Sequence, residues 1–538
     1  MSRERSANRS IFPIHVKLNS RFCAFLKKAE IINFVTPSNP YDHEDNMSSA
    51  ITRRTAFRFA AATCLTGAVS ACGGAEASGL GLQLAGPLAP APRKILIRGA
   101  TIVSMDANVG NLTKGDILIA DGTIAAIGLQ LDAGGAEVID AAEMIAIPGM
   151  VDTHRHCWEG QLRRINPNAA NLGDYSNATH LSFAKYYRPR DIYVGNMVSA
   201  LGCIDAGITT VIDNSHNSRT DAHSDAAVDA MLDAGIRTVH VAGAPVAGDW
   251  DKAHWPGNLA RLNAKYLANR PAGLLTLGVM DAFPKLETDQ WAVARELGAV
   301  IVTEFIGSDL AVQLEALHRK GLLRSDNIFN HCVGLPESAW RILREAGVRV
   351  SVTPRSDAHY GIEDGMNAWQ KALEQGIRPG LSVDNETSYS GDMFMEMRVA
   401  FYLRRVLGSG GNPDVAASTN ASRLLQAATI DGAACAGLEK RTGSLTPGKQ
   451  ADVVLIRTRD LNIYPVNNAI GTVVHAAERS NVDTVIIGGR LRKRDGVVLG
   501  VDQAKLRTAI DESRTHLFNA AGYQPDPFSE TFKPIHGT

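Results

Sequence analysis

The 538-residue sequence has little of several features that define protein classes. Its seven cysteines, at positions 23, 64, 72, 157, 203, 332 and 435, have neither zinc-ribbon spacing nor the density of a disulfide scaffold. Neither sign of charge is in excess, because 55 basic residues stand against 56 acidic ones and the net charge is −1. This balance argues against a nucleic-acid partner and against an acidic, solvated tail.

An export signal is predicted near the N-terminus, at residues 51–74. Arg53 and Arg54 precede an apolar run from Phe57 to Ala71, which is shorter than the about 20 residues of a membrane-spanning helix. A charged region, an apolar region and a small-residue exit are typical of a secretory signal, and the paired arginines resemble a twin-arginine signal. Met47 lies at a suitable distance before them and is an alternative translation start to Met1.

The end of this segment also resembles a bacterial lipobox. In Val69-Ser70-Ala71-Cys72 the cysteine would become the lipidated first residue of the mature chain and anchor it to a membrane. The Gly-, Ala- and Pro-rich stretch at 73–93 is interpreted as a linker. We therefore expect an exported protein, periplasmic or lipid-anchored. The alternative is a cytoplasmic protein whose N-terminal stretch forms an amphipathic helix.

The chain after this extension (residues 1–93) divides into three regions by its pattern. Short β-branched runs, broken by Gly and Asp-Gly turns, fill residues 94–147. The same pattern returns at 436–538, which we interpret as a continuation of the first small domain followed by a C-terminal tail. Between them, at 148–435, apolar strand-like runs alternate with helical stretches. Helical stretches such as AAVDAMLDAG and PESAWRILREAG each close on a glycine.

Eight apolar runs in the middle region predict a parallel barrel. In chain order they are IAIPGMVDTH, GITTVID, IRTVHVA, LLTLGVM, AVIVTEF, NIFNH, VRVSVT and GLSVD. Near-continuous apolar strands separated by helices are typical of parallel sheets that are covered on both faces. The predicted fold class is therefore α/β, with a (β/α)₈ TIM-type barrel.

Two histidines end the first of these runs. His154 and His156 lie at i and i+2 in Val151-Asp152-Thr153-His154-Arg155-His156, so on a strand they project to the same side. At the carboxyl end of a barrel strand that side faces the mouth of the active site. Two converging imidazoles form half of a metal site. The alternative is a hydrogen-bonded pair of core histidines.

Two other strand ends carry matching chemistry. His331 follows the sixth run and Asp384 ends the eighth, in Ser382-Val383-Asp384-Asn385. A carboxylate that faces histidines can serve as a metal ligand and as a proton acceptor. Alone, Asp384 would be interpreted as a helix cap or loop residue, but three such strand ends together favour a metal site. Cys157 and Cys332 each follow one of these histidines and are expected to point away, as structural residues.

These motifs resemble the amidohydrolase superfamily. PGMVDTHRHCWEG is similar to its first-strand signature, in the branch of deaminases and triazine or chloro-hydrolases, and later stretches of that branch resemble AGITTVIDNSHN, HCVGL, GLSVDNETSYSGDMFMEMR and GSLTPGKQADVVLI. The resemblance implies a distorted (β/α)₈ barrel, a composite β-sandwich made from both chain ends, and one divalent metal ion, usually zinc or iron. It also implies that His154, His156 and Asp384 are ligands and that His331 lies beside the metal.

One feature of that branch is missing. Its fifth strand normally carries a histidine ligand, often followed three residues later by a proton-shuttling glutamate. The matching run, VTEFIGS at 302–308, has Phe305 at the ligand position, or Glu304 after a one-residue shift. Glu304 could supply an oxygen ligand, which zinc accepts, if a slip or bulge turns it inward. Two alternatives stay open, in which His331 becomes a ligand or the site is metal-poor.

Five residues after the barrel strands are candidate substrate contacts. They are Trp158 and Glu159 after the first run, His216 after the second, and Arg355 and His359 on a loop after the seventh. A guanidinium such as that of Arg355 can bind a substrate carboxylate in bidentate fashion. For each residue the alternative is a solvated loop position. The long segment at 160–191, rich in tyrosine and asparagine, is interpreted as a lid of mixed polarity.

The expected activity is hydrolysis of a non-peptide carbon–nitrogen bond, in an amidine, an amide or an amino-heterocycle, by metal-activated water. Asp384 would move the proton, and His331 would donate to the developing oxyanion or the water. The alternatives are non-hydrolytic chemistry such as decarboxylation on the same barrel, or an exported binding protein that has lost catalysis. The expected cofactor is zinc, with iron as the alternative, the partner is a small-molecule substrate, and the resemblance favours a homo-oligomer.

Overall fold

The fold is described from a computed structural model, which covers residue 84 and residues 94–251, 257–268, 273–281, 288–304, 307, 310–362, 365–407 and 418–533. The predicted export signal, Cys72 and the rest of the linker lie outside these residues. Leu84, the one described residue of the linker, is buried in the core of the barrel region. Within this range no helix is both long and apolar enough to cross a membrane.

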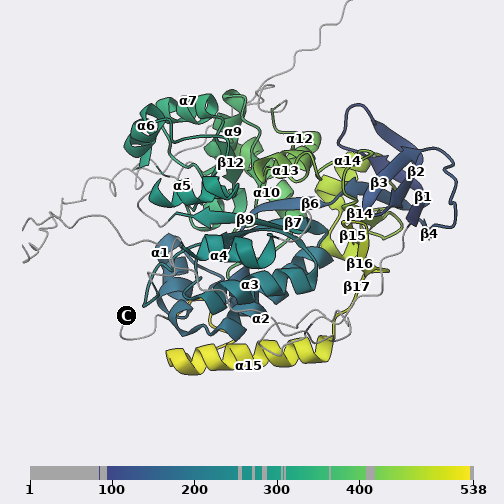
Figure 1. The fold of residues 1–538 in the computed structure, drawn as a ribbon. Coiled ribbons are helices and arrows are strands. Elements are labelled where there is room, and N and C mark those ends of the chain that lie inside the picture. The colour runs from purple at the N-terminus through teal and green to yellow at the C-terminus, as the bar shows by residue number, and fades with distance from the viewer. Residues whose placement is uncertain are drawn as a thin grey trace, which may run out of the picture. The chain divides into compact units, whose positions relative to one another are not determined.

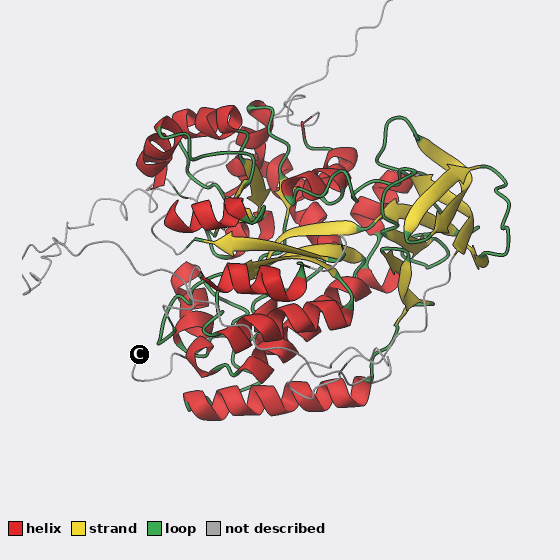
Figure 2. Cartoon of the chain, viewed as in Figure 1, coloured by secondary structure: helices red, strands yellow, loops and turns green. Residues whose placement is uncertain are grey.

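Eight parallel strands form the barrel, and they correspond to the eight apolar runs (Figures 1 and 2). They are neighbours in chain order: β6 (Met150–Arg155), β7 (Ile208–Ser215), β8 (Arg237–Ala242), β9 (Leu275–Met280), β10 (Val300–Thr303), β11 (Asn327–Asn330), β12 (Arg349–Val352) and β13 (Gly380–Leu381). Every residue of β6, β7 and β8 is buried, as expected for strands covered on both faces. The predicted barrel is confirmed.

The barrel closes through an irregular seam between its first and last strands. β13 has only two residues, and beyond it an isolated parallel bridge joins Arg155 to Asp384. The backbone N–H of Asp384 donates to the carbonyl of His154, and the N–H of His156 donates to the carbonyl of Asp384, both at 2.8 Å. The seam therefore places the eighth-strand aspartate directly beside the histidine pair.

Helices connect the strands and cover the outside of the barrel. They are α2 (Pro189–Asp205), α3 (Asp221–Ala234), α4 (Gly257–Tyr266), α5 (Thr288–Glu296), α6 (Ala311–Arg319), α7 (Glu337–Ala346), α9 (Gly365–Glu374), α10 (Met393–Leu407), α12 (Ala421–Ala427) and α13 (Ile430–Cys435). The two predicted glycine ends are confirmed, because α3 and α7 stop at Gly235 and Gly347, with φ of 70° and 69°. Glycine adopts this left-handed conformation without a steric penalty.

The two chain ends share one further sheet. Its N-terminal strands are β1 (Lys94–Val103), β2 (Asn111–Ala120), β3 (Thr123–Gly128), β4 (Glu137–Asp140) and β5 (Met144–Pro148), and its C-terminal strands are β14 (Val453–Arg457), β15 (Val482–Ile487), β16 (Arg490–Arg494) and β17 (Val497–Val498). β5 pairs with β14, which joins the two groups, and the outer strand β3 curls back until Thr123 bridges Gln450. The predicted composite sandwich is therefore one continuous sheet, folded over its own apolar core.

The predicted C-terminal tail contains an ordered helix, α15 (Gln503–Ala521), which packs along α2 (Figure 1). The hydroxyl of Ser513 donates to Asp191 at 2.8 Å and accepts from the amide of Gln161 at 3.0 Å. Both partners belong to the barrel region, so this helix fastens the chain end to the barrel rather than to the small sheet.

A buried ion pair joins the small sheet to the barrel. The Nε and Nη2 atoms of Arg237, on β8, donate to the two carboxylate oxygens of Asp452, each at 2.9 Å. The hydroxyl of Thr442 and the backbone N–H of Gly488 donate to the same carboxylate at 2.8 and 2.7 Å. All the charge on this carboxylate is therefore compensated inside the protein.

We expect Asp452→Ala to lower the free energy of unfolding by about 3–5 kcal/mol, because it leaves a buried guanidinium without a counter-charge. Chemical denaturation checks the value. Glu315→Ala is the matched control, since its pair with Arg319 is solvent-exposed and such pairs contribute at most about 1 kcal/mol. Equal stability of the two variants would contradict the prediction.

Candidate metal centre

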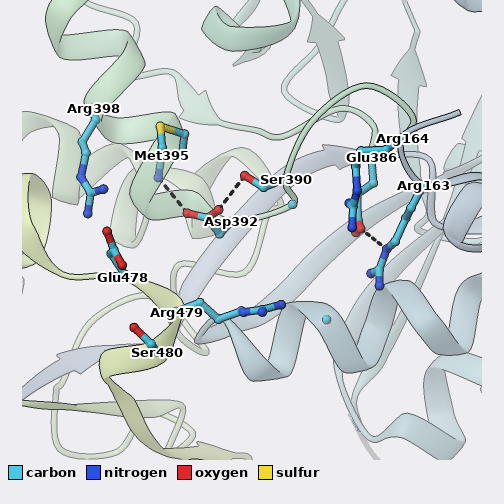
Figure 3. A pocket seen from close by; sticks show the side chains of 12 residues that line it. Arg163, Arg164, Glu386, Ser390, Asp392, Met395, Arg398, Glu478, Arg479 and Ser480 are labelled. Carbon is cyan, nitrogen blue, oxygen red and sulfur yellow. Dashed lines mark hydrogen bonds and ion pairs between the residues drawn. The ribbon is translucent and has the colours of Figure 1, made fainter. Parts of the chain in front are cut away.

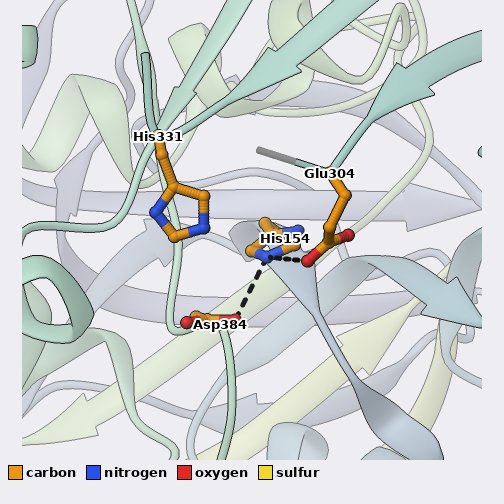
Figure 4. Close-up of side chains that lie close together, drawn as sticks. All are labelled: His154, Glu304, His331 and Asp384. Carbon is orange, nitrogen blue, oxygen red and sulfur yellow. Dashed lines mark hydrogen bonds and ion pairs between the residues drawn. The ribbon is translucent and has the colours of Figure 1, made fainter. Parts of the chain in front are cut away.

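Four polar side chains from four different strands meet at the carboxyl ends of the barrel (Figure 4). His154 lies on β6, and Glu304, His331 and Asp384 follow β10, β11 and β13. One ligand atom from each lies within 4.8 Å of those of the others. The imidazoles and Asp384 are buried, and the Glu304 side chain is 18% exposed. The barrel thus brings together residues that are up to 230 positions apart in the sequence.

His156 completes the inner part of this cluster. Its Nε2 atom lies 2.9 Å from Oε1 of Glu304 and 3.1 Å from Oδ1 of Asp384. The Nε2 atom of His154 lies 3.4 and 3.1 Å from the same two oxygens. Two imidazole nitrogens and two carboxylate oxygens therefore converge on one point. The structure brings all five predicted metal-site residues into one place.

Glu304 reaches the cluster without the slip or bulge that we predicted. β10 pairs with β9 and β11 in continuous register. Val300 and Val302 lie in an apolar cluster inside the barrel, and Glu304 follows them at the next position of the same period-two pattern. Phe305, the other candidate for this position, lies outside the described residues. The requirement for a bulge was wrong, because the strand already points Glu304 inward.

The charges of the cluster support one another. Burial opposes protonation of His154, but the negative charge of Glu304 and the hydrogen bond to Asp384 outweigh it and raise its pKa to about 9. The same carboxylates raise the pKa of His156. Despite burial, the imidazoles hold the pKa values of Glu304 and Asp384 well below their usual range. The cluster therefore attracts positive charge, and this donor set fits a divalent cation, whose binding would release the protons.

Two asparagines support His154 from behind. The Asn214 and Asn330 side-chain amides lie 2.6 and 2.8 Å from its Nδ1 atom. A metal-binding Nε2 requires a proton on Nδ1 and therefore an acceptor beside it. The Oδ1 atoms of both amides have no hydrogen-bond partner among the described residues, so Asn330 can supply that acceptor by turning its amide. The Nδ1 atom of His156 similarly lies 3.2 Å from the carbonyl of Asn214.

We expect Asn330→Leu to weaken metal binding by about 10- to 100-fold, because removal of such supporting partners typically costs that much affinity. Competition with a chromophoric chelator measures the affinity. The control is Asn330→Asp, which keeps an acceptor oxygen beside Nδ1 of His154. Asn327→Leu on the same strand is unsuitable as a control, because Asn327 accepts a hydrogen bond from the backbone N–H of Arg324. Equal affinity of Asn330→Leu and the wild type would contradict the assigned role.

His331 is held in a fixed orientation beside the cluster. Its Nδ1 atom lies 2.8 Å from Oδ1 of Asp357 and 2.7 Å from the hydroxyl of Thr353. Its ring meets that of His154 edge-on, with 5.4 Å between centroids. His331 has φ of 62° and Asp384 has φ of 73°, a left-handed conformation that costs a non-glycine residue about 1–2 kcal/mol. Such backbone strain is concentrated at functional sites.

The segment after β12 is a short helix, α8 (Pro354–His359), and not the loop that we predicted. Proline at its first position favours this start. The helix supplies Asp357 to His331 and directs the hydroxyl of Ser356 to Oδ2 of Asp384. Both contacts were missed in the sequence, because neither residue belongs to a strand whose alternation would indicate its direction.

Three of the five predicted substrate contacts lie near the cluster. The ring of His216 is 4.3 Å from that of His156, and Trp158 packs edge-on against His216 at 5.8 Å. Glu159 is buried and accepts a hydrogen bond from the hydroxyl of Tyr175 at 2.7 Å. Burial raises the pKa of Glu159 to about 8, although His156 opposes the shift.

The other two predicted contacts, Arg355 and His359, are engaged elsewhere. Arg355 pairs with Glu396 at 2.6 Å and stacks on the ring of Tyr389. Its guanidinium is therefore occupied by a buried carboxylate of the protein rather than presented to a substrate carboxylate. His359 is half-buried and packs against the rings of Tyr360 and Tyr389. The structure does not bring either side chain to the metal cluster.

The predicted lid segment covers the cluster with aromatic rings. Tyr175 lies on α1 (Leu172–Ser176) and stacks over His156, with 6.3 Å between centroids. It also contacts Tyr360, which follows α8. His180, five residues later, packs at 4.4 Å against His216. Sequence reasoning missed Tyr175 and His180, because this long connection has no period from which to infer their direction.

The structure also contains a separate cleft of about 380 Å³ (Figure 3). Arg163, Arg164, Arg398 and Arg479 line it together with Glu386. Glu386 accepts hydrogen bonds from Arg155, at 2.5 Å, and pairs with Arg163. Because Arg155 stands between the two metal-site histidines, this carboxylate connects the wall of the cleft to the first barrel strand. None of the five metal-site residues lines the cleft.

A parallel barrel with this donor set at its mouth belongs to the class of metal-dependent hydrolases. The sequence profile of the amidohydrolase family matches residues 293–492. The 5-methylthioadenosine/S-adenosylhomocysteine deaminase of Desulforamulus reducens is 30% identical over 453 residues, which are 79% of this chain and 99% of that protein. The chain belongs to the amidohydrolase family. The predicted family and the predicted class, hydrolases of non-peptide carbon–nitrogen bonds, are confirmed.

Other relatives agree with this assignment. The 5'-deoxyadenosine deaminase of Methanosarcina mazei is 26% identical over 428 residues, 77% of this chain and 95% of that protein. Among solved structures, a zinc-bound adenosine deaminase from Xanthomonas campestris superposes with a TM-score of 0.69 at 20% identity, over 80% of this chain and all of its own. A zinc-bound atrazine chlorohydrolase from Arthrobacter aurescens has a TM-score of 0.70 at 21% identity, over 78% and 100%. These two likenesses concern the fold.

Proposed function

We propose that the protein is a zinc-dependent deaminase, which replaces the amino group of an adenine-type nucleoside derivative by water and releases ammonia. The observation that carries the proposal is the convergence of His154, His156, Glu304 and Asp384 at the barrel mouth. Relatives similar over nearly their whole length are deaminases of adenosine derivatives, which supports this substrate class.

The same four residues would hold one divalent cation. Two imidazole nitrogens and two carboxylate oxygens form a set that zinc accepts, and iron is the alternative metal. A cation bound there lowers the pKa of a bound water toward neutrality. Glu304 takes the role of the missing fifth-strand histidine in this proposal, and His331 remains beside the metal as a hydrogen-bond donor.

Asp384 would carry the proton through the reaction. Ser356 and Asn385 donate to its Oδ2 atom and so orient the carboxylate with Oδ1 facing both histidines, where Oδ1 would hold the cation. The same carboxylate would accept the proton of the attacking water. The oxygen of that water would bond to the ring carbon to give a tetrahedral state. Asp384 would then pass the proton to the amine nitrogen, the carbon–nitrogen bond would break, and ammonia would leave. Position 307, three residues after Glu304, is a glycine, so no glutamate shares this work there.

His331 would stabilise the charge that develops opposite Asp384. Its Nδ1–H is committed to Asp357, which orients the other ring nitrogen toward the cluster. Donation from that nitrogen to the attacking oxygen favours the tetrahedral state over the planar ring. The aromatic side chains over the centre, Tyr175, Trp158 and Tyr360, are buried and would pack against a planar heterocycle after the lid segment moves aside.

The proposal is tested with the zinc-loaded full chain and a panel of 5'-substituted adenosines. We expect the release of one ammonia for each molecule of substrate converted. The absorbance of the purine should change at the same time from that of the 6-amino form to that of the 6-oxo form. Carbon dioxide in place of ammonia from a carboxylated substrate would favour the decarboxylation alternative. Saturable binding of the panel without any product would favour the binding-protein alternative, and the proposed activity would then be wrong.

We also propose that the protein is exported through the segment at 51–74, that Cys72 is lipidated and that the chain forms a homo-oligomer. The support is the charge and hydropathy pattern of that segment and the paired arginines. Mass spectrometry of the mature N-terminus tests both processing steps, and light scattering of the purified protein tests the oligomer. An unprocessed N-terminus in the producing cell would contradict the export proposal.

A further inference from the structure

We propose a second divalent-cation site next to the first, formed by Glu159, His180 and His216. The inference goes beyond the proposed function, which needs only one cation. One ligand atom from each of the three residues lies within 4.8 Å of those of the others. Two imidazoles and one glutamate are a donor set found at catalytic zinc sites. The three side chains are buried, with 1%, 4% and 3% of their surfaces exposed.

Three donor atoms of this second cluster lack a hydrogen-bond partner among the described residues. Neither ring nitrogen of His216 has a hydrogen-bond partner among the residues that the structure covers, and neither has Oε2 of Glu159. Buried polar atoms without partners are costly and rare in proteins. By contrast, both ring nitrogens of His223 are engaged, with Thr220 and with the carbonyl of Tyr187. His216 therefore lacks the contacts of a structural core histidine.

The carboxylate of Glu304 lies between the two clusters. Its Oε1 atom is 2.9 Å from Nε2 of His156, on the side of the first cluster. Its Oε2 atom points away from His154 (Figure 4) and is 3.9 Å from Nδ1 of His216. His156, His216 and Glu304 also form a group with ligand atoms within 4.8 Å of one another. A carboxylate in this position can give one oxygen to each of two cations, as in two-metal hydrolases.

The carboxylates of the two clusters have no lysine or arginine partner among the described residues. The two clusters contain the carboxylates of Glu159, Glu304 and Asp384. In the described part of the chain the ion pairs of Glu304 and Asp384 are all with histidines, and Glu159 has none. Buried carboxylates without lysine or arginine partners are compensated by metal ions in many proteins. A cation bound at the second cluster would displace the proton of Glu159 and give this carboxylate a charged partner.

Elemental analysis of the full chain, loaded with excess zinc and freed of unbound metal, tests the proposal. We expect about two zinc ions per chain in the wild type and about one in each of His180→Ala and Glu159→Gln. Tyr175→Phe is the matched control, because it removes the hydrogen bond to Glu159 but no donor atom, and we expect about two ions. One ion per chain in the wild type, or two in His180→Ala, would overturn the proposal.

A spectroscopic measurement on the wild type tests the second site even if the variants fail to fold. Titration of the metal-free full chain with Mn²⁺ should saturate at about two equivalents. The electron paramagnetic resonance spectrum of the saturated protein should show the broadening of two coupled ions. Saturation at one equivalent with an uncoupled spectrum would overturn the second site. Two ions without deaminase activity would contradict only the proposed function, and activity with one ion would contradict only the second site.

Discussion

Asp384→Asn is expected to lower kcat for deamination by about 10²–10⁴-fold, the range attributed to general acid–base catalysis. The amide has the shape of the carboxylate but cannot accept the proton of the attacking water. The fold should survive, because residue 384 has φ of 73° and asparagine is among the residues that tolerate this left-handed region best. The hydrogen bonds of the barrel seam at this position use the backbone, so they are unaffected.

The measurement is ammonia release at saturating substrate, combined with thermal unfolding of the same preparations. Asp392→Asn is the matched control: it makes the same chemical change in the same loop, at a residue that caps α10 through the N–H of Met395. Asparagine and aspartate are about equally good caps, so we expect activity and stability near those of the wild type. Turnover by Asp384→Asn at the rate of this control would rule out the proposed proton path.

The barrel could be predicted from the sequence because its strands are buried on both faces. Burial makes each strand a continuous apolar run, and the eight runs contain β6 to β13 in chain order, although residues 145–148 of the first run belong to β5 of the other sheet. The resemblance implied that both chain ends share one β domain, but the strand pairing within it could not be predicted, since β5 and β14 join residues more than 300 positions apart. Local patterns identify strands, whereas such long-range pairing depends on the packing of the whole chain.

The first metal cluster could be predicted as far as strand alternation reaches. Ile212, Val302 and Ile328 lie inside the barrel, and residues two and four positions later point the same way. This rule indicates Asn214, His216, Glu304 and Asn330 without any bulge. We missed the two asparagines because an amide at a strand end does not by itself indicate a metal ligand or a proton acceptor. Its role here follows from the ring nitrogen of His154 that it faces.

The rest of the site depends on segments without a period. Tyr175 and His180 lie in a connection made of short helical turns, and Ser356 and Asp357 lie on a helix of six residues. A single turn of helix has too few positions for an apolar stripe to indicate which side chain points to the centre. The second proposed cation site was therefore only partly visible in the sequence: Glu159 and His216 were candidate contacts, but the third residue, His180, belongs to the segment that covers the centre.

Glu304→Ala is expected to weaken the binding of the first metal ion by about 10²–10⁴-fold, because it removes one charged donor from a buried set, a change that typically costs about 3–5 kcal/mol. Glu304→Gln keeps the size of the side chain and an oxygen that can accept from Asn214, but it removes the charge. The difference in metal affinity between the two variants therefore separates the effect of the charge from that of the side-chain shape. Competition with a chromophoric chelator measures each affinity.

Glu304→His provides the decisive comparison for the role of this position. The branch that the sequence resembles has a histidine ligand there, so an imidazole at residue 304 should restore much of the first-site affinity that alanine loses. It offers one donor nitrogen in place of two carboxylate oxygens, and it therefore should not restore the second ion beside His216. Wild-type affinity in Glu304→Ala would instead transfer the ligand role to His331, whose ring already lies 5.4 Å from that of His154.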